Sequence, residues 1–175
     1  MIHTAGLSYT PFLNSNLGMV VKLYCSDSHK LGSGGVGYVN LRASLPSYQN
    51  FCKILNAIIG VLGPELPSWG KSKTLIQVLN EELNEETDEG IKVEVLKSIQ
   101  HFMMFSIESI NLQKLVQTLL KHLSSNRRTL KVASINSIYQ LVQKNAMVMS
   151  KLGGDKLVVN LFSILDDDPT IEGAR

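Results

Sequence analysis

Two short motifs in the chain resemble nucleotide-binding loops, which would be the clearest sign of chemistry. Residues 32–37 read GSGGVG and fit the G-x-G-x-x-G pattern of a dinucleotide-binding turn. That turn requires a strand before it, whereas a helix-like apolar stretch precedes this one. Gly70-Lys71-Ser72 has the ending of a phosphate-binding P-loop, but six residues separate it from Gly63 where the motif requires four. We therefore interpret both segments as loops between helices.

Residues that could bind a metal or act as nucleophiles show no spacing typical of a metal or catalytic site. Four histidines stand far apart along the chain: His3, His29, His101 and His122. None is followed by a metal-ligating residue three or four positions later. Cys25 and Cys52 are too few and too distant for a disulfide framework or a CxxC metal site, so we expect reduced cysteines packed in the core. The sequence predicts no catalytic residue, no metal and no cofactor, and hence no enzyme.

The composition is that of a folded protein without a general attraction to polyanions. The chain has 175 residues, of which 44% are hydrophobic and 18% charged, and its net charge is +2. No uninterrupted apolar stretch reaches the roughly 20 residues of a membrane span. Residues 1–9 lack the order of a signal peptide, basic and then apolar. We expect a cytoplasmic protein that binds neither nucleic acid nor a small-molecule substrate.

A short phrase recurs along the chain: a polar turn, an aliphatic residue and then a charged one. Its copies are Ile91-Lys92, Leu130-Lys131 and Ile171-Glu172, which lie 39 and then 41 residues apart. A period of roughly 40 to 47 residues with two helices per unit is typical of HEAT and armadillo solenoids, whose units bury their apolar faces by stacking. The spacing therefore predicts an all-α fold, an α-α superhelix (HEAT/armadillo-like solenoid) of about seven or eight helices in antiparallel pairs.

Capping residues and apolar periodicity predict where the first helices begin and end. Thr10-Pro11 joins a cap residue to a proline suited to a first turn, and we expect a helix from there to about residue 28. Ser47 is expected to cap a second helix that ends at Gly63-Pro64. Ser72 is expected to cap a third helix over residues 75–83.

The second half of the chain has a clearer helical pattern. A fourth helix is expected from Ile91, and Asn111 is expected to cap a fifth whose apolar residues fit the i, i+3, i+4, i+7 template throughout. A sixth helix, apolar on several sides as an inner helix requires, should run to about Asn145. Asp155 is expected to cap a seventh helix that ends at residues 166–168, and Pro169 to begin an eighth.

These helices are expected to form a single segment, residues 1–175, of a longer solenoid. Its repeats are approximately 10–66, 70–107, 110–147 and a truncated 154–175. Small residues in the inner helices would allow close helix approach: Ser98, Ala133, Ser134 and Ser137. We expect Leu119 and Ile138 to lie in the core.

Charges gather at the turns between helix pairs and alternate in sign. Residues 85–89 are acidic, Arg127, Arg128 and Lys131 are basic, and residues 166–168 are acidic again. Equivalent turns of a solenoid line up, so these charges should form one ridge. Solubility and favourable helix-dipole contacts are the simplest explanation. The alternative is that Arg127, Arg128 and Lys131 contact a protein partner.

Four stretches of the chain carry a family resemblance: residues 56–66 (NAIIGVLGPEL), 110–116, 122–125 and 128–138. Within a similarity that extends from residue 9 to about residue 166, they resemble HEAT repeat-containing protein 5. The resemblance implies a very long, cytosolic α-solenoid that binds the clathrin adaptor complex and its accessory subunits at the trans-Golgi network, endosomes and clathrin-coated vesicles. Such a protein supports adaptor recruitment and sorting between endosomes and Golgi, and its membrane association is indirect.

Other function classes stay open. A HEAT scaffold of another pathway, such as nuclear transport or a nucleic-acid-associated complex, would have the same periodicity. Direct nucleic-acid binding through the basic turn would be steeply sensitive to salt. An enzyme would be expected to bind nucleotide at residues 70–72.

Overall fold

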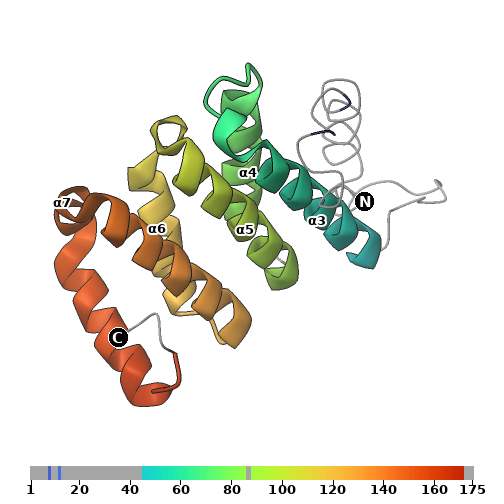
Figure 1. Cartoon of the computed structure of the whole chain (residues 1–175). Coiled ribbons are helices and arrows are strands. Elements are labelled where there is room, and N and C mark those ends of the chain that lie inside the picture. The colour runs from blue at the N-terminus through green and yellow to red at the C-terminus, as the bar shows by residue number, and fades with distance from the viewer. Residues whose placement is uncertain (1–7, 9–11, 13–44, 86–87, 172–175) are drawn as a thin grey trace.

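The computed structural model describes Ser8, Phe12 and residues 45–85 and 88–171, and the regular structure of this part is entirely helical (Figure 1). The elements in order are α3 (Leu45–Leu62), the 3-10 turn η2 (Gly63–Glu65), α4 (Ser72–Glu85), α5 (Glu89–Phe105), the 3-10 turn η3 (Ile107–Ser109), α6 (Leu112–Leu123) and α7 (Arg128–Asp167). The predicted all-α class is confirmed, with no strand among the described residues. The expected helix over residues 10–28, the loop at residues 32–37 and Cys25 lie outside the described residues.

The helices form two layers (Figure 1). In one layer α3, α5 and the first half of α7, residues 128–144, lie side by side, and α5 contacts both of its neighbours. The second layer contains α4, which packs on α5, and α6, which packs on α7. Each helix therefore packs mainly on helices that are close to it in the sequence.

A single apolar cluster joins the two layers. Its members come from every α-helix described, and the fully buried ones include Leu55, Ile59, Leu79, Ile99, Phe102 and Leu119. The aliphatic residues that open the recurring phrase, Ile91, Leu130 and Ile171, are at most 3% exposed. Ile138, Ser98, Ser134 and Ser137 are also buried, as is Cys52, in agreement with the sequence analysis. The recurrence therefore marks positions that face the core.

The limits of α3 and α4 differ in part from the expected ones. The helix α3 begins at Leu45, so Ser47 lies inside its first turn and the expected Ser47 cap is wrong. The expected end at Gly63-Pro64 is confirmed, since Gly63 adopts a φ of 36° that glycine tolerates best. Ser72 is the first residue of α4, and its hydroxyl donates to the Leu66 carbonyl.

Side-chain caps define the starts of α5 and α6. Asp88 Oδ1 accepts a hydrogen bond of 2.8 Å from the backbone N–H of Ile91. Asn111 Oδ1 accepts one of 3.1 Å from the backbone N–H of Lys114, so the expected Asn111 cap is confirmed. Both bonds satisfy an N–H that the first helical turn leaves without a partner.

The helix α7 bends in the middle. Asn145 (φ −153°, ψ 65°) and Gly153 (φ 152°) leave the helical conformation, and a second half, residues 154–167, follows in a different direction (Figure 1). The expected end near Asn145 is thus confirmed. Asn145 Oδ1 itself accepts from the Val148 N–H at 3.3 Å, so helical turns resume at once. Asp155 then lies inside a helix, and its expected role as a cap is wrong.

The chain after α7 forms a turn. Asp168 Oδ1 accepts a hydrogen bond of 3.1 Å from the Thr170 N–H, and Pro169 and Thr170 are not helical. The expected eighth helix therefore does not begin at Pro169. Residues 172–175 lie outside the described part, and the expected number of helices stays a prediction.

Candidate interaction surfaces

Polar residues at successive turns contact one another along one edge of the molecule, which we call the turn ladder. Gln49 Nε2 donates to Asp88 Oδ1 at 3.3 Å. Arg127 Nε lies 3.4 Å from Glu89 Oε2, and Arg128 Nε lies 2.8 Å from Asp168 Oδ2. The turn ladder is therefore composed of Gln49, Asp88, Glu89, Arg127, Arg128, Asp168 and Thr170, whose side chain accepts from Arg128. The alternation of sign expected from the sequence is present along it.

The two ion pairs of the turn ladder join neighbouring turns with the charges exchanged. Glu89 and Arg128 are each the first residue after an N-cap, which is Asp88 in α5 and Arg127 in α7. Glu89 pairs with Arg127 at 3.4 Å. Arg128 pairs with Asp168, the C-cap of α7, and donates a hydrogen bond of 2.8 Å to it. Either arrangement of the charges therefore connects one turn to the next.

The arginines of the ladder are open to solvent, whereas the carboxylates that they pair with are partly buried. The side chains of Arg127 and Arg128 are 78% and 62% exposed. Glu89 Oε2 makes no hydrogen bond, so its contact with Arg127 is purely electrostatic, and such surface pairs contribute about 0–1 kcal/mol. Hydrogen bonds from Thr170 and Arg128 lower the pKa of Asp168 to about 2. Asp168 therefore remains ionised at every physiological pH.

All three basic residues singled out in the sequence lie at the start of α7. Arg127 and Arg128 form ion pairs within the chain, and Lys131 is half-buried. A partner would have to compete with Glu89 and Asp168 for the two guanidinium groups. Contact of Arg127, Arg128 and Lys131 with a partner stays a prediction.

His122 lies close to the turn ladder but inside the protein. Its side chain is buried, and Nδ1 has no hydrogen-bond partner among the described residues. Burial lowers the pKa of His122 from 6.5 to about 4, and the nearby Lys92 acts in the same direction. Its imidazole is neutral at physiological pH and packs as a core side chain.

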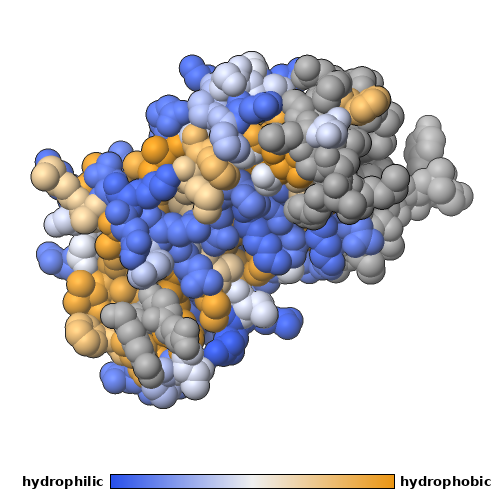
Figure 2. Space-filling model, viewed as in Figure 1, coloured by the Kyte–Doolittle hydropathy of each residue, from blue (hydrophilic) through white to orange (hydrophobic). Residues whose placement is uncertain are grey.

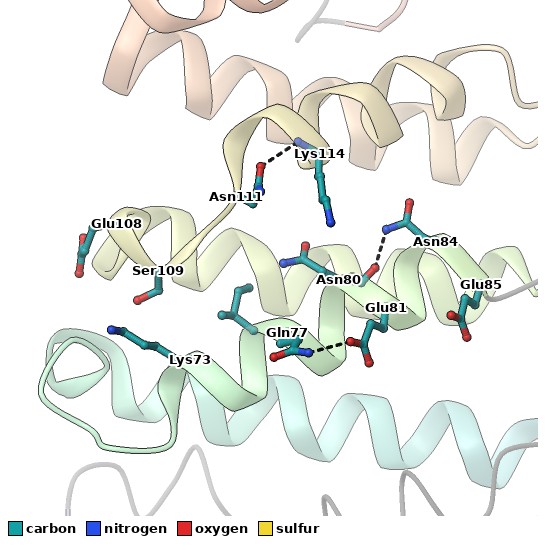
Figure 3. Close-up of a pocket in the computed structure, with 11 residues that line it drawn as sticks. Lys73, Gln77, Asn80, Glu81, Asn84, Glu85, Glu108, Ser109, Asn111 and Lys114 are labelled. Atoms are coloured by element: carbon teal, nitrogen blue, oxygen red, sulfur yellow. Dashed lines mark hydrogen bonds between the residues drawn. The ribbon is translucent and has the colours of Figure 1, made fainter.

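A polar groove lies between α4 and the start of α6 (Figure 3). Its volume is about 540 Å³. One wall, from α4, consists of Lys73, Ile76, Gln77, Asn80, Glu81, Asn84 and Glu85. The other wall consists of Glu108, Ser109, Asn111 and Lys114. Amides and charged groups of both signs thus face a common space.

Many of the polar side chains in this groove are bonded to one another or to the backbone. Gln77 Nε2 donates to Glu81 Oε1 at 2.9 Å, and Asn84 Nδ2 donates to the Asn80 carbonyl at 2.7 Å (Figure 3). Asn84 Oδ1 also accepts from Thr118 Oγ1 at 2.7 Å, which ties α4 to α6. These bonds fix the groove's shape and leave it suited to hydrogen bonding with a polar segment of another molecule.

The serine that lines the groove has another serine hydroxyl as its neighbour. Ser109 Oγ lies 2.8 Å from Ser106 Oγ, and neither histidine nor cysteine lines the groove to activate it. Within residues 45–85 and 88–171 no three His, Cys, Asp or Glu side chains gather in a way that could hold a metal ion. In the same part of the chain, none of the helices has both the length and the apolar character of a membrane span.

The sequence analysis did not identify the polar groove. A signal was present, because Gln77, Asn80, Glu81 and Asn84 recur at spacings of three and four, which places them on one face of a helix. That spacing does not indicate which element faces this row. The opposite wall, from η3 and α6, is decided by how the two helix pairs pack.

Comparison with known proteins gives a distant similarity. The chain is 22% identical over 171 residues to Protein SWEETIE of Arabidopsis thaliana, a match that covers 98% of this chain and 7% of that protein. The chain thus spans a small fraction of the length of the relative it matches. No family profile matches the chain, and no solved structure matches it.

Proposed function

We propose that this chain is a segment of a non-catalytic HEAT-repeat scaffold, an α-solenoid that binds protein partners. The observation that carries the proposal is the sequence separation of the interhelical hydrogen bonds. Gln49–Asp88, Gln100–Ser137, Thr118–Asn84 and Arg128–Asp168 join residues 34 to 40 apart. Contacts restricted to the neighbouring unit, at a nearly constant separation, are the defining property of repeat arrays.

The packing between inner helices supports the same proposal. Gln100 Nε2 of α5 donates to Ser137 Oγ of α7 at 3.0 Å, and Ser98, Ser134 and Ser137 are buried. Small side chains allow the helices to approach closely. In the proposed solenoid α4 and α5 form one repeat, and α6 and the first half of α7 form the next.

An exposed apolar row on the second half of α7 fits a stacking role. Val158, Val159 and Phe162 are each more than half exposed, and Figure 2 shows hydrophobic residues gathered over this part of the molecule. In a longer solenoid a further helix pair would cover such a row. The Arabidopsis relative is long enough to hold many such units, since this chain matches 7% of it.

For the parent protein we propose recruitment of the clathrin adaptor complex and vesicle sorting between endosomes and Golgi, through protein–protein interactions. The basis is the resemblance of residues 56–66 to HEAT repeat-containing protein 5, which here form the end of α3 and the turn that follows. The protein would be cytoplasmic and peripheral at the trans-Golgi network, endosomes and clathrin-coated vesicles. The alternative is a HEAT scaffold of nuclear transport or of a nucleic-acid-associated complex.

Proximity labelling from the full-length parent protein tests the pathway. We expect adaptor subunits among the labelled proteins, and less of that labelling when residues 45–171 are deleted. Deletion of a helical segment of equal length elsewhere in the parent is the matched control. Labelling of nuclear transport proteins without adaptor subunits would favour the alternative.

A calorimetric titration of the 175-residue chain with ATP tests the non-catalytic part of the proposal. We expect no heat of binding, because Ser72 already donates to Leu66 and the residues before Gly70 do not form a phosphate-binding loop. Heat that disappears in Lys71→Ala would contradict the proposal.

A further inference from the structure

A second hollow, smaller and more apolar than the polar groove, lies between α5 and the first half of α7. Its volume is about 170 Å³. It is lined by Met103 and Met104 from α5 and by Tyr139, Gln140, Gln143 and Lys144 from α7. We call it the α5–α7 hollow.

The walls of the α5–α7 hollow offer apolar surface to solvent. Met104 is 49% exposed and Tyr139 is 53% exposed, while Met103 is buried below them. Thioether side chains adapt to irregular apolar partners, and a tyrosine ring supplies a large rigid contact area. Methionine and tyrosine are enriched at protein interfaces, so one bulky apolar side chain of a partner fits this place.

Two glutamines line the hollow beside the apolar residues. Gln140 Oε1 is removed from solvent and has no hydrogen-bond partner among the described residues, so it lies below the surface that a peptide would contact. Gln143 Nε2 donates to Tyr139 Oη at 2.7 Å, which positions the tyrosine ring at the hollow.

The charge around the hollow favours an acidic partner. No carboxylate lines the hollow, and the sequence from Arg128 to Gly154 contains neither Asp nor Glu. Lys144 is exposed, and its ammonium donates to the Met104 carbonyl near the end of α5. An ammonium has three donors, so Lys144 can still bind a carboxylate. The polar groove differs, since three glutamates line it.

We propose that the α5–α7 hollow binds an acidic peptide segment of a partner protein. A bulky apolar side chain of the peptide lies between Met104 and Tyr139, and a carboxylate of the peptide contacts Lys144. This inference rests on the scaffold function proposed above and specifies the chemistry of one partner.

Selection from a displayed library of random peptides against the complete 175-residue chain tests the inference. We expect the enriched peptides to combine carboxylates with a Leu, Phe or Trp. Their binding site is then located by NMR of the chain labelled with ¹³C at the methionine methyl groups. The Met103 and Met104 signals should shift on addition of a selected peptide, while that of Met147, exposed beyond the bend of α7, should not.

Matched variants separate binding from folding. Tyr139→Ala and Met104→Ala should each weaken binding of the selected peptide about tenfold, whereas Phe162→Ala and Gln117→Leu, which change exposed residues away from the hollow, should leave affinity unchanged. Neither hollow variant should lower the thermal unfolding midpoint by much, because both side chains are about half exposed.

The contribution of charge is tested at two exposed lysines. Lys144→Glu should weaken binding about tenfold at low salt and less at high salt, and Lys151→Glu should have little effect. Selection that enriches no peptide, enriches basic peptides, or yields peptides that bind the hollow variants as well as the unmodified chain would overturn the inference. If the intact parent protein labelled no adaptor subunits while the chain bound the selected peptide normally, the result would instead count against the proposed pathway.

Discussion

The apolar core and the turn ladder both join successive helix pairs, but they do so under opposite conditions. Ile138 and Leu119 are removed from solvent between the two layers, whereas Arg127 and Arg128 form their ion pairs at the open edge. Burial of an aliphatic side chain contributes about 1.5–3 kcal/mol, while water and salt screen exposed ion pairs to about 0–1 kcal/mol. The core therefore supplies the stability, and the ladder follows the register that the core sets.

The recurring phrase shows the same contrast. Its aliphatic position is occupied by Ile91, Leu130 and Ile171, all buried. In the turn ladder the residue after the N-cap changes sign from one ion pair to the next: it is Glu89, paired with Arg127, and then Arg128, paired with Asp168. Little energy depends on that sign, so either arrangement is compatible with the fold.

Truncation of the core should have the largest effect. Ile138→Ala and Leu119→Ala should each lower the free energy of unfolding by about 2–5 kcal/mol, because they remove buried methyl groups and leave cavities. Urea unfolding followed by circular dichroism measures the change. Lys121→Ala, on the exposed side of α6, is the control and should cost less than about 0.5 kcal/mol. Equal costs for the three variants would refute the distinction between core and edge.

His122 lies between the two regions and should give an intermediate, pH-dependent effect. Its folded pKa, about 4, is below the unfolded value of 6.5. Between these values the unfolded chain binds a proton that the folded chain does not, so stability falls as pH drops from about 6.5 to about 4. With partial screening by solvent, we expect a loss of about 1–2 kcal/mol.

Urea unfolding at several pH values between these limits measures the His122 effect. The His122→Gln variant should lack this part of the pH dependence. If it retained the full slope of the unmodified chain, another group would be responsible.

Loss of a helix cap should cost somewhat less. Asn111→Ala removes the acceptor for the Lys114 N–H at the start of α6, and caps of this kind contribute about 1 kcal/mol. Gln113→Ala changes an exposed residue two positions later in the same helical turn and is the matched control for urea unfolding. A loss in both variants would indicate that alanine in this turn, rather than the lost cap, is responsible.

The turn ladder should show the smallest effect. A double-mutant cycle of Glu89→Gln and Arg127→Gln should give a coupling energy of about 0.2–1 kcal/mol. The coupling should decrease in 1 M salt, because the Debye length is then about 3 Å. A coupling above about 2 kcal/mol that resists salt would make the ladder a stabilising element in its own right.

The limits of the helices show which sequence signals are reliable. The helix α6 agrees with its predicted cap and periodicity, because Asn111 competes with no other start signal. The expected caps at Ser47 and Asp155 are wrong because both residues lie inside helices: Ser47 in α3, and Asp155 two residues after the non-helical Gly153 of α7. A capping residue type is common, and neighbouring backbone preferences decide whether it is used.

The candidate sites were predicted less well than the helices. Arg127, Arg128 and Lys131 were visible as a basic turn, but their pairing with Glu89 and Asp168 depends on residues 38 and 40 positions away. Neither hollow could be located from the sequence, because the walls of each come from elements that only the packing brings together.

The amino-acid sequence by itself determined the helical class, the apolar faces and the aliphatic residues that recur at 39 and 41 residues, because these follow from local periodicity and from burial of each helix on its neighbours. Only the tertiary structure decided which turn charges meet, where α7 bends, and that Met104 lies beside Tyr139. Those contacts depend on the stacking and rotation of adjacent helices, which result from packing summed over the whole interface.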